Sequence, residues 1–261
     1  MRSAPTLALL LFAAALPVAS SNRQTHNQKS PDHLDPKPTS FVTRSIKLTS
    51  PDPPGESPDW ERTPGSGTLE ATWPQSNQKT PEWNAWNKAV EAAAQEIAKT
   101  AVEKDSTGEW SRKWATDRDA DVYVSVGIVG SNLVTVSVSL EVAGHGAAHS
   151  SEDSFELNWL MKQKREMLPK DVFRPNSSWQ DFIEARCSKG LEQDLDSLYS
   201  DWKDTLPKVV LNPRNWTIDN KGIAVNFPEY SVSPRVYPVG PITISWTALK
   251  PYLQRSFIVP K

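Results

Sequence analysis

Two neighbouring runs of strictly alternating apolar and polar residues constrain the fold more than any other stretch of the chain. The runs occupy residues 122–128 and 134–142, and Gly130, Ser131 and Asn132 between them favour a turn. Because successive side chains of a strand point to opposite faces, each run has one apolar face and one face of mostly serine and threonine. The pattern predicts a β-hairpin whose apolar face is covered by a helical layer.

A helix that could form this layer is predicted shortly before the hairpin. Thr80 is a suitable cap, Pro81 fits the first helical position, and Glu82 fits the first turn. Apolar residues then recur at three- and four-residue steps along one stripe: Trp83, Trp86, Val90, Ala94, Ile97 and Ala101. Such a stripe is typical of a helix packed against a sheet, so we interpret its two tryptophans as core residues rather than a sugar-stacking pair.

A second long helix is predicted in the C-terminal half. Its apolar stripe runs from Trp179 to Trp202 and stops before Pro207, while Ser178 and Asp181 have the spacing of a capping box at its start. Other alternating or apolar runs predict short strands at residues 42–48, 69–73, 155–159, 216–218, 223–227 and 242–246. Together these elements predict an α+β fold, with a mainly antiparallel sheet and two long amphipathic helices packed on it.

Turn and cap residues are also recognisable near the C-terminus. A turn is predicted at Asp219–Gly222, where we expect Gly222 to supply a positive φ angle. Thr247 is the predicted cap of a helical turn that begins at Ala248. These residues predict a strand-turn-strand segment, and none of them suggests a reaction centre.

The first 19 residues have the layout of a secretory signal peptide. Arg2 precedes an apolar run from Leu7 to Ala15, and small residues follow where a signal peptidase could cleave. The run is far shorter than the ~20 residues of a membrane-spanning helix, which disfavours an uncleaved anchor. Residues 20–40 are polar and proline-bearing without periodicity, and are predicted to be a disordered leader. We therefore expect an exported protein, periplasmic or extracellular, whose residues 41–261 form the folded module in an N-terminal part (41–150) and a C-terminal part (151–261).

The charge balance and the single cysteine exclude some functions. The chain has 29 basic and 31 acidic residues and no dominant basic block. Nucleic acid is therefore a disfavoured partner, because neutralising phosphates requires a basic face. Cys187 lies within the apolar pattern of the second predicted helix and is interpreted as a packed, unreactive thiol. With no partner for a disulfide, the fold has to depend on its own core.

Few residues suggest a cofactor or a catalytic site. His145 and His149 are four residues apart, but they lie in a glycine-bearing connection without a third candidate ligand. An ordinary loop is the favoured interpretation, and no metal or other cofactor is predicted. No Gly-x-Ser-x-Gly motif accompanies the histidines, which disfavours a serine hydrolase. Asp153 and Glu229 could form a glycosidase-like acid pair, although so many acidic residues produce such pairs by chance.

The order of several motifs resembles one family of extracytoplasmic bacterial domains. The motifs are Gly-Ala-Ala-His149 with Phe155-Glu-Leu-Asn158, Leu168-Pro-Lys-Asp171-Val-Phe173, and the segments that start at Trp216 and Gly240. They resemble the paired, non-catalytic module found in RsiV-type anti-sigma factors and PdaC-type peptidoglycan deacetylases, over about Phe41 to Leu253. The sequence departs from this family at Ala147, where a second glycine is usual.

The resemblance implies a binding or sensing module. RsiV-type proteins recognise lysozyme through this domain, so the expected partner is lysozyme, another cell-wall-active protein or peptidoglycan. We recognise no transmembrane segment beyond the signal sequence and no deacetylase domain. We therefore expect only the extracytoplasmic module of the family. The candidate partner-binding residues are His149 and, in the loop Pro228–Gly240, Tyr230 and Tyr237.

Three other interpretations of the sequence stay open. The chain could be a cell-wall hydrolase or esterase that uses His149 and nearby carboxylates, or a structural envelope protein without a dedicated ligand. Trp60, Trp110 and Trp114 fall outside the clearest core stripes and could form an aromatic binding patch, although packing is the favoured role.

Overall fold

The computed structural model of the chain describes residues 39–49, 67–101, 118–144 and 147–260. The predicted signal peptide and nearly all of the predicted leader lie outside these ranges. His145 and the tryptophans at positions 60, 110 and 114 also lie outside them, so the predicted aromatic patch stays untested. No helix within the described ranges is long and apolar enough to span a membrane.

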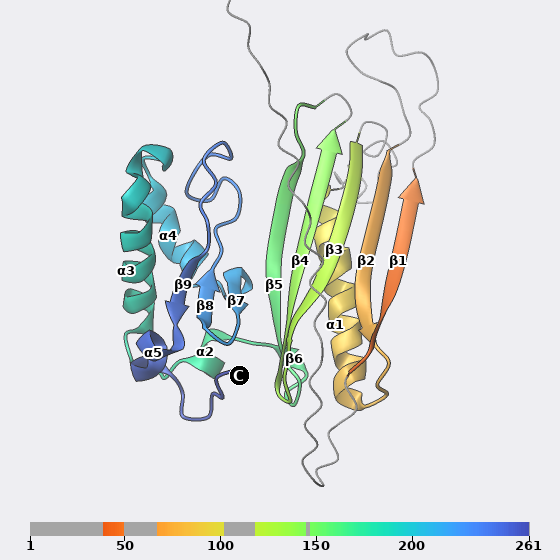
Figure 1. The fold of residues 1–261 in the computed structure, drawn as a ribbon, viewed down its shortest axis with the longest axis horizontal. Coiled ribbons are helices and arrows are strands. Elements are labelled where there is room, and N and C mark those ends of the chain that lie inside the picture. Colours follow the sequence, from red (N-terminus) through yellow and green to blue (C-terminus); the bar gives the residue numbers. More distant parts are fainter. Residues whose placement is uncertain (1–38, 50–66, 102–117, 145–146, 261) are drawn as a thin grey trace, which may run out of the picture. The chain divides into compact units, whose positions relative to one another are not determined.

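Six strands form the larger of two sheets (Figure 1). They follow one another in chain order: β1 (Phe41–Thr49), β2 (Thr68–Ser76), β3 (Arg118–Val129), β4 (Leu133–Gly144), β5 (Ser151–Leu160) and β6 (Arg165–Glu166). All neighbours are antiparallel except β2 and β3, which pair in parallel. A parallel pair needs a crossover connection, and helix α1 (Pro81–Ala98) lies in it, followed by a 3-10 turn, Lys99–Ala101. The predicted hairpin is confirmed as β3–β4, with a bulge between Val126 and Val129.

Helix α1 covers one face of this sheet and forms the first core with it. The Oγ1 atom of Thr80 accepts a hydrogen bond from the Trp83 N–H at 3.3 Å, which confirms the predicted cap. All six residues of the predicted apolar stripe are buried. They pack against alternate residues of the central strands: Leu69, Ala71, Val122, Val134, Val136, Val138, Leu140, Leu157 and Trp159. The predicted helical layer on the apolar face of the hairpin is therefore confirmed.

A smaller antiparallel sheet and several helices form a second core. The strands are β7 (Trp216–Ile218), β8 (Gly222–Val225) and β9 (Ile242–Ser245). The helices are α2 (Pro169–Val172), α3 (Trp179–Leu191), α4 (Trp202–Val210) and α5 (Trp246–Leu249), with 3-10 turns at Glu192–Ser197, Pro213–Asn215 and Lys250–Tyr252. Figure 1 shows α3 and α4 on the side of the small sheet that faces away from β5. The predicted α+β fold is confirmed, but its strands are divided between two sheets.

Strand β5 contributes side chains to both cores. Leu157 and Trp159 pack on the α1 side, whereas Leu160 belongs to the second core. Between them, the buried side chain of Asn158 donates hydrogen bonds from Nδ2 to the carbonyls of Trp216 (2.8 Å) and Pro213 (3.3 Å). The face of β5 that the alternating pattern marks as polar is therefore covered by the C-terminal elements.

The second long helix is shorter than predicted. Helix α3 ends at Leu191, and α4 is a separate helix that contains Pro207. A straight helix from Trp179 to Trp202 would be about 36 Å long at 1.5 Å per residue. The strands beneath it have only three or four residues, or roughly 13 Å at their usual rise per residue. Breaking the helix lets both segments bury their apolar residues against the same small sheet.

Two predicted helix caps are wrong. Ser178 adopts a left-handed conformation (φ 53°), and its side chain makes no capping hydrogen bond to α3. At the last helix, Ser245 is the cap, because its Oγ accepts a hydrogen bond from the Ala248 N–H at 3.3 Å. Thr247 instead lies inside α5, which begins at Trp246.

The predicted turn at Asp219–Gly222 is confirmed, but the reason for the glycine is different. The Oδ1 atom of Asp219 accepts hydrogen bonds from the N–H groups of Lys221 (2.7 Å) and Gly222 (2.9 Å). The φ angle of Gly222 lies outside the left-handed region that favours glycine. A Cβ atom at this position would instead overlap the carbonyl oxygen of Ile244 on the paired strand β9. Close approach of two strands, rather than backbone conformation, requires the glycine.

Candidate functional site

The loop from Pro228 to Gly240, between β8 and β9, is anchored at several points. Its central residues Val232 and Ser233 are buried, and the Val232 carbonyl accepts a hydrogen bond from the Tyr199 N–H at 3.0 Å. An ion pair of 3.1 Å between Glu229 and Arg235 closes the loop around this anchor. The backbone of the loop is therefore fixed by its own contacts.

Three large side chains of this loop are open to solvent. Tyr230 is 58% exposed, Tyr237 56% and Val236 76%. Tyr230 also has a left-handed backbone (φ 60°), a conformation that costs a residue other than glycine about 1 kcal/mol and recurs at functional sites. The two tyrosines predicted to bind a partner are thus accessible and held by an ordered loop.

A row of carboxylates crosses the larger sheet near this loop. The strand register aligns Glu70, Asp121, Glu141 and Glu152 on β2, β3, β4 and β5. Aligned side chains project from the same face of a sheet, and the neighbouring apolar positions pack against α1. These four residues, called the acidic row below, therefore lie on the face opposite α1. Lys47 extends the row on β1 and pairs with Glu70 at 3.3 Å.

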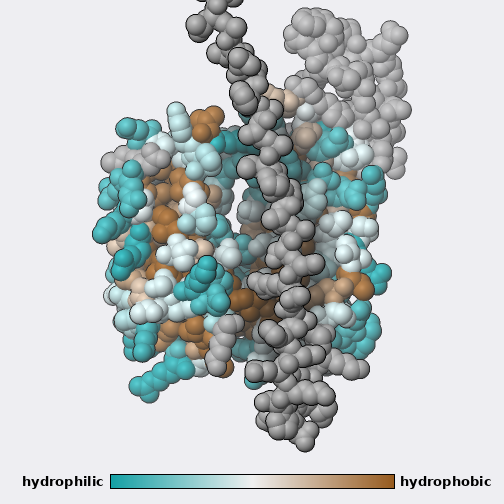
Figure 2. Space-filling view, viewed as in Figure 1, coloured by the Kyte–Doolittle hydropathy of each residue, from teal (hydrophilic) through white to brown (hydrophobic). Residues whose placement is uncertain are grey.

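One end of the acidic row contacts the loop Pro228–Gly240, called the tyrosine loop below. The Glu152 N–H donates a hydrogen bond to Glu229 Oε2 at 3.4 Å, so the end of the row touches the residue next to Tyr230. Figure 1 shows the start of β5 and the loop between β8 and β9 at the same end of the molecule. In the view of Figure 2, apolar side chains on the C-terminal half are interspersed with hydrophilic ones.

The carboxylates of the acidic row repel one another. Partial burial raises the pKa of Asp121, and Glu70, Asp119 and Glu141 raise it further. Like charges directly opposite on paired strands destabilise a sheet by roughly 0.2–1 kcal/mol per pair. A cationic partner would relieve this repulsion.

His149 is exposed in the connection between β4 and β5. None of the hydrogen bonds or ring contacts within the described ranges joins it to Tyr230 or Tyr237. His145, which could share a metal ion with it, lies outside the described residues. Within those residues, no group of three or more histidine, cysteine, aspartate or glutamate side chains is arranged to hold a metal ion.

Asp153 and Glu229, considered as an acid pair, each have another partner. Both oxygens of Glu229 are engaged, one by Arg235 and the other by the Glu152 N–H. Asp153 is the next residue along β5 and projects from the opposite face, where its Oδ1 accepts a hydrogen bond from the Ser154 N–H at 2.8 Å. The ion pair with Arg235 favours the ionised form of Glu229, which disfavours it as a general acid.

Cys187 is fully buried on α3, as its place in the apolar stripe predicts. Burial raises the pKa of its thiol to about 12, so the reactive thiolate is scarce at neutral pH. The interpretation as a packed, unreactive cysteine is confirmed.

A second group of polar residues lies between the two sheets and is shielded from solvent. Glu156 is 8% exposed, and its oxygens accept hydrogen bonds from Ser137 Oγ (2.9 and 3.0 Å) and Thr217 Oγ1 (2.9 Å). Asn226 Nδ2 donates to Thr217 Oγ1 at 2.8 Å. No cationic side chain within the described part of the chain pairs with Glu156, and burial raises the pKa of its carboxyl. This cluster joins β4, β5 and β7 through a buried carboxylate.

Replacing Glu156 by glutamine is expected to stabilise the protein at neutral pH by roughly 1–2 kcal/mol, because it removes an unpaired buried charge. The raised pKa makes the parent lose stability as the pH rises from the unfolded-state value of about 4.5 through the folded-state value. The advantage of the variant should therefore grow with pH over this window, as measured by urea unfolding at several pH values. Glu91→Gln, on α1, is the control and should change stability by less than about 0.5 kcal/mol. A variant advantage that shrinks as the pH rises would contradict the role of the charge.

Sequence reasoning missed the acidic row and the Glu156 cluster. Asp121 directly precedes the first run of the predicted hairpin and Glu141 lies near the end of the second, so the hairpin register could have aligned them. Glu70 joins them only through the parallel pairing of β2 with β3. For Glu156 the available signal is a charged residue inside an apolar run, between Phe155 and Leu157.

Comparisons with known proteins agree with the fold and leave the activity open. Residues 170–246 match the model of DUF3298, a family described as a protein of unknown function. No curated protein sequence matches the chain.

A crystal structure of a DUF3298 family member from Bacteroides fragilis is similar at a TM-score of 0.57 and 14% identity, over 83% of this chain and 94% of that one. A DUF3298 family protein from Pseudomonas aeruginosa has the same TM-score at 15% identity, over 84% of this chain and 96% of that one. At these identities the likeness establishes the fold alone. The segment matched by the family model includes the tyrosine loop and β7 to β9.

Proposed function

We propose that the chain is an exported binding module of the bacterial cell envelope, and that it captures a cationic protein such as lysozyme. The observation that carries the proposal is the anchored loop that presents Tyr230 and Tyr237 to solvent beside the acidic row. The resemblance to RsiV-type and PdaC-type modules and the signal-like first 19 residues support it.

The loop has the physical properties of a protein-binding surface. Tyrosine offers a large contact area with few rotatable bonds, and exposed tyrosines are enriched among residues that dominate binding energies. The Glu229–Arg235 ion pair and the buried Val232 fix the backbone before a partner arrives. Little conformational entropy is then lost when the complex forms.

The acidic row favours a partner of positive charge. Four aligned carboxylates, of which Glu70 is paired with Lys47, attract a basic protein surface and accelerate its association. The mutual repulsion that raises the pKa of Asp121 would also fall when positive charge approaches. Lysozyme of the c-type is strongly cationic and is therefore a suitable first probe.

Replacing both loop tyrosines by alanine is expected to weaken lysozyme binding by roughly 30-fold or more, since each exposed aromatic contact contributes on the order of 1–2 kcal/mol. Biolayer interferometry with the mature protein measures this. Val129→Ala, an exposed apolar truncation at the far end of β3 from Asp121, is the matched control and should bind like the parent.

A second comparison tests the acidic row separately. Glu141→Gln with Glu152→Gln should lower the association rate several-fold and flatten its dependence on salt, while dissociation changes little. The proposal fails if neither lysozyme nor any other cationic envelope protein is retained by the mature protein. It also fails if the tyrosine variants bind as tightly as the parent, because the loop would then not be the contact surface.

A further inference from the structure

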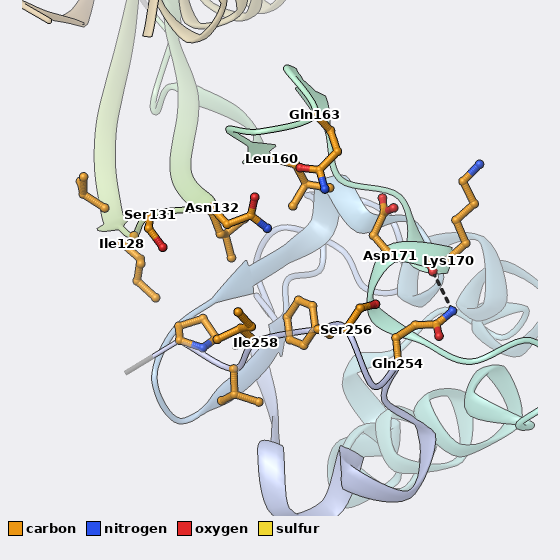
Figure 3. A pocket seen from close by; sticks show the side chains of 16 residues that line it. Ile128, Ser131, Asn132, Leu160, Gln163, Lys170, Asp171, Gln254, Ser256 and Ile258 are labelled. Carbon is orange, nitrogen blue, oxygen red and sulfur yellow. Dashed lines mark hydrogen bonds between the residues drawn. The ribbon is translucent and has the colours of Figure 1, made fainter. Parts of the chain in front are cut away.

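A pocket of about 460 Å³ lies between the β3–β4 turn and the C-terminal segment (Figure 3). Residues 128–133 of the turn region form one wall, and residues 254–260 form the opposite wall. Leu160, Gln163, Lys170 and Asp171 complete the lining. The volume is in the range of pockets that enclose small organic ligands.

The pocket presents no usable charge to a ligand. Asp171 is engaged by the Arg165 guanidinium, which donates to both carboxylate oxygens at 2.7 and 2.8 Å, and by the Leu168 N–H at 2.8 Å. The same guanidinium lowers the pKa of Asp171. Figure 3 shows the Lys170 side chain extending away from Asn132 and Ser256. An anionic or cationic ligand would therefore lose its hydration without gaining a counter-charge.

Neutral hydrogen-bonding groups line the pocket instead. The Nδ2 atom of Asn132 is accessible, whereas its Oδ1 atom is buried away from the pocket. Gln254 donates from Nε2 to the Lys170 carbonyl at 3.2 Å, which leaves its own carbonyl oxygen available. Ser131, Gln163 and Ser256 add two hydroxyls and a carboxamide. Together these groups donate and accept hydrogen bonds without carrying a charge.

Apolar side chains complete an amphipathic interior. Leu133 and Leu160 are buried at the base of the pocket, and Phe257 packs on Trp246 with ring centroids 5.5 Å apart. This contact fixes the position of the phenylalanine ring. Ile258 is 75% exposed at the opposite wall and could cover a bound molecule.

We propose that this pocket binds a short uncharged saccharide. Sugar hydroxyls both donate and accept hydrogen bonds, as do the carboxamides and hydroxyls of the lining, and the C–H face of a sugar ring matches Phe257 and Leu160. The Asn132 Nδ2 atom donates to a hydroxyl or an acetamido carbonyl of the ligand. The site is independent of the tyrosine loop, so it stands or falls separately from the proposed capture of a protein.

The test is a titration of the full chain with cellobiose and with the N-acetylglucosamine disaccharide. Binding is measured by calorimetry and by tryptophan fluorescence. Binding against Phe257 should change the emission of Trp246, which packs on it. Asn132→Leu removes the carboxamide donor and should weaken binding roughly tenfold or more. The hydrogen bond from the Met161 N–H to the Asn132 carbonyl involves only backbone, so the variant keeps it.

Two further variants complete the design. Gln163→Ala should weaken binding in the same direction and serves if Asn132→Leu unfolds. Tyr237→Ala, on the loop, should leave saccharide binding unchanged. The proposal is overturned if neither disaccharide binds at millimolar concentration, or if both pocket variants bind like the parent. Tighter binding of glucuronate or glucosamine 6-phosphate than of the neutral sugars would also overturn it, since the pocket would then select charge.

Discussion

Replacing Asn158 by aspartate is expected to lower the free energy of unfolding by about 3–5 kcal/mol at neutral pH. The substitution keeps the size of the side chain but puts an oxygen where Nδ2 now donates to the Trp216 and Pro213 carbonyls. Two hydrogen bonds become two repulsive contacts. The side chain is 1% exposed, and its Oδ1 atom already lacks a partner, so nothing nearby can solvate a carboxylate.

The loss should depend on pH in a defined direction. Burial without donors raises the folded-state pKa of the new carboxyl above its unfolded value of about 3.9. The destabilisation is therefore smallest below that value and grows as the pH rises through the folded-state pKa. Urea unfolding of the variant and the parent at acidic and neutral pH measures both parts of the prediction.

Asn84→Asp is the matched control for this substitution. Asn84 is exposed in the first turn of α1, where a negative charge is tolerated by the helix dipole. It should change stability by less than about 0.5 kcal/mol. If Asn158→Asp were as mild as this control, the side chain of Asn158 would not be a major link between β5 and the C-terminal elements.

Replacing Gly222 by alanine is expected to destabilise the protein by about 3 kcal/mol, near the upper end for overpacking. The added Cβ would overlap the Ile244 carbonyl oxygen and lie 2.8 Å from the carbonyl carbon. Because both atoms belong to the backbone of β9, no side chain can move aside. The strands β8 and β9 have to separate, which weakens the pairing of Gly222 with Ser245. Thermal and chemical unfolding both report this loss.

Gly240→Ala provides the comparison within the same small sheet region. A Cβ atom at Gly240 would meet no other atom within 4 Å, and its φ angle lies outside the left-handed region. The variant should be neutral or slightly more stable, by up to about 1 kcal/mol, because alanine restricts the unfolded chain. Equal losses in the two variants would show that a general need for glycine, rather than the approach of β9, governs this region.

The elements that sequence reasoning placed correctly are those with a long, strict period. The β3–β4 hairpin alternates over most of its length, and α1 has both a cap at Thr80 and an apolar stripe. Such local signals depend only on which face of an element is buried. These local signals also predicted the α+β fold class, because few folds combine antiparallel hairpins with amphipathic helices.

What the sequence did not reveal depends on contacts between distant segments. The break between α3 and α4 follows from the short strands that these helices cover. No residue of the apolar stripe from Trp179 to Trp202 indicates the break from sequence alone. The acidic row exists because β2 pairs in parallel with β3 across α1, which sets Glu70 beside Asp121. The close approach at Gly222 likewise requires β9, about twenty residues further along the chain.

The sharing of β5 between two cores has a consequence for how the protein unfolds. Leu157 and Trp159 support the α1 side, while Asn158 and Leu160 support the other, so one strand backbone serves both. Arg214 adds a second link, since its guanidinium pairs with Glu166 on β6 (3.0 Å) and with Glu96 on α1 (2.5 Å). Unfolding of either core would remove the side-chain contacts on one face of β5. We therefore expect the amide hydrogens of β5 to exchange with solvent only when the whole protein unfolds. The two cores should then unfold in a single cooperative transition.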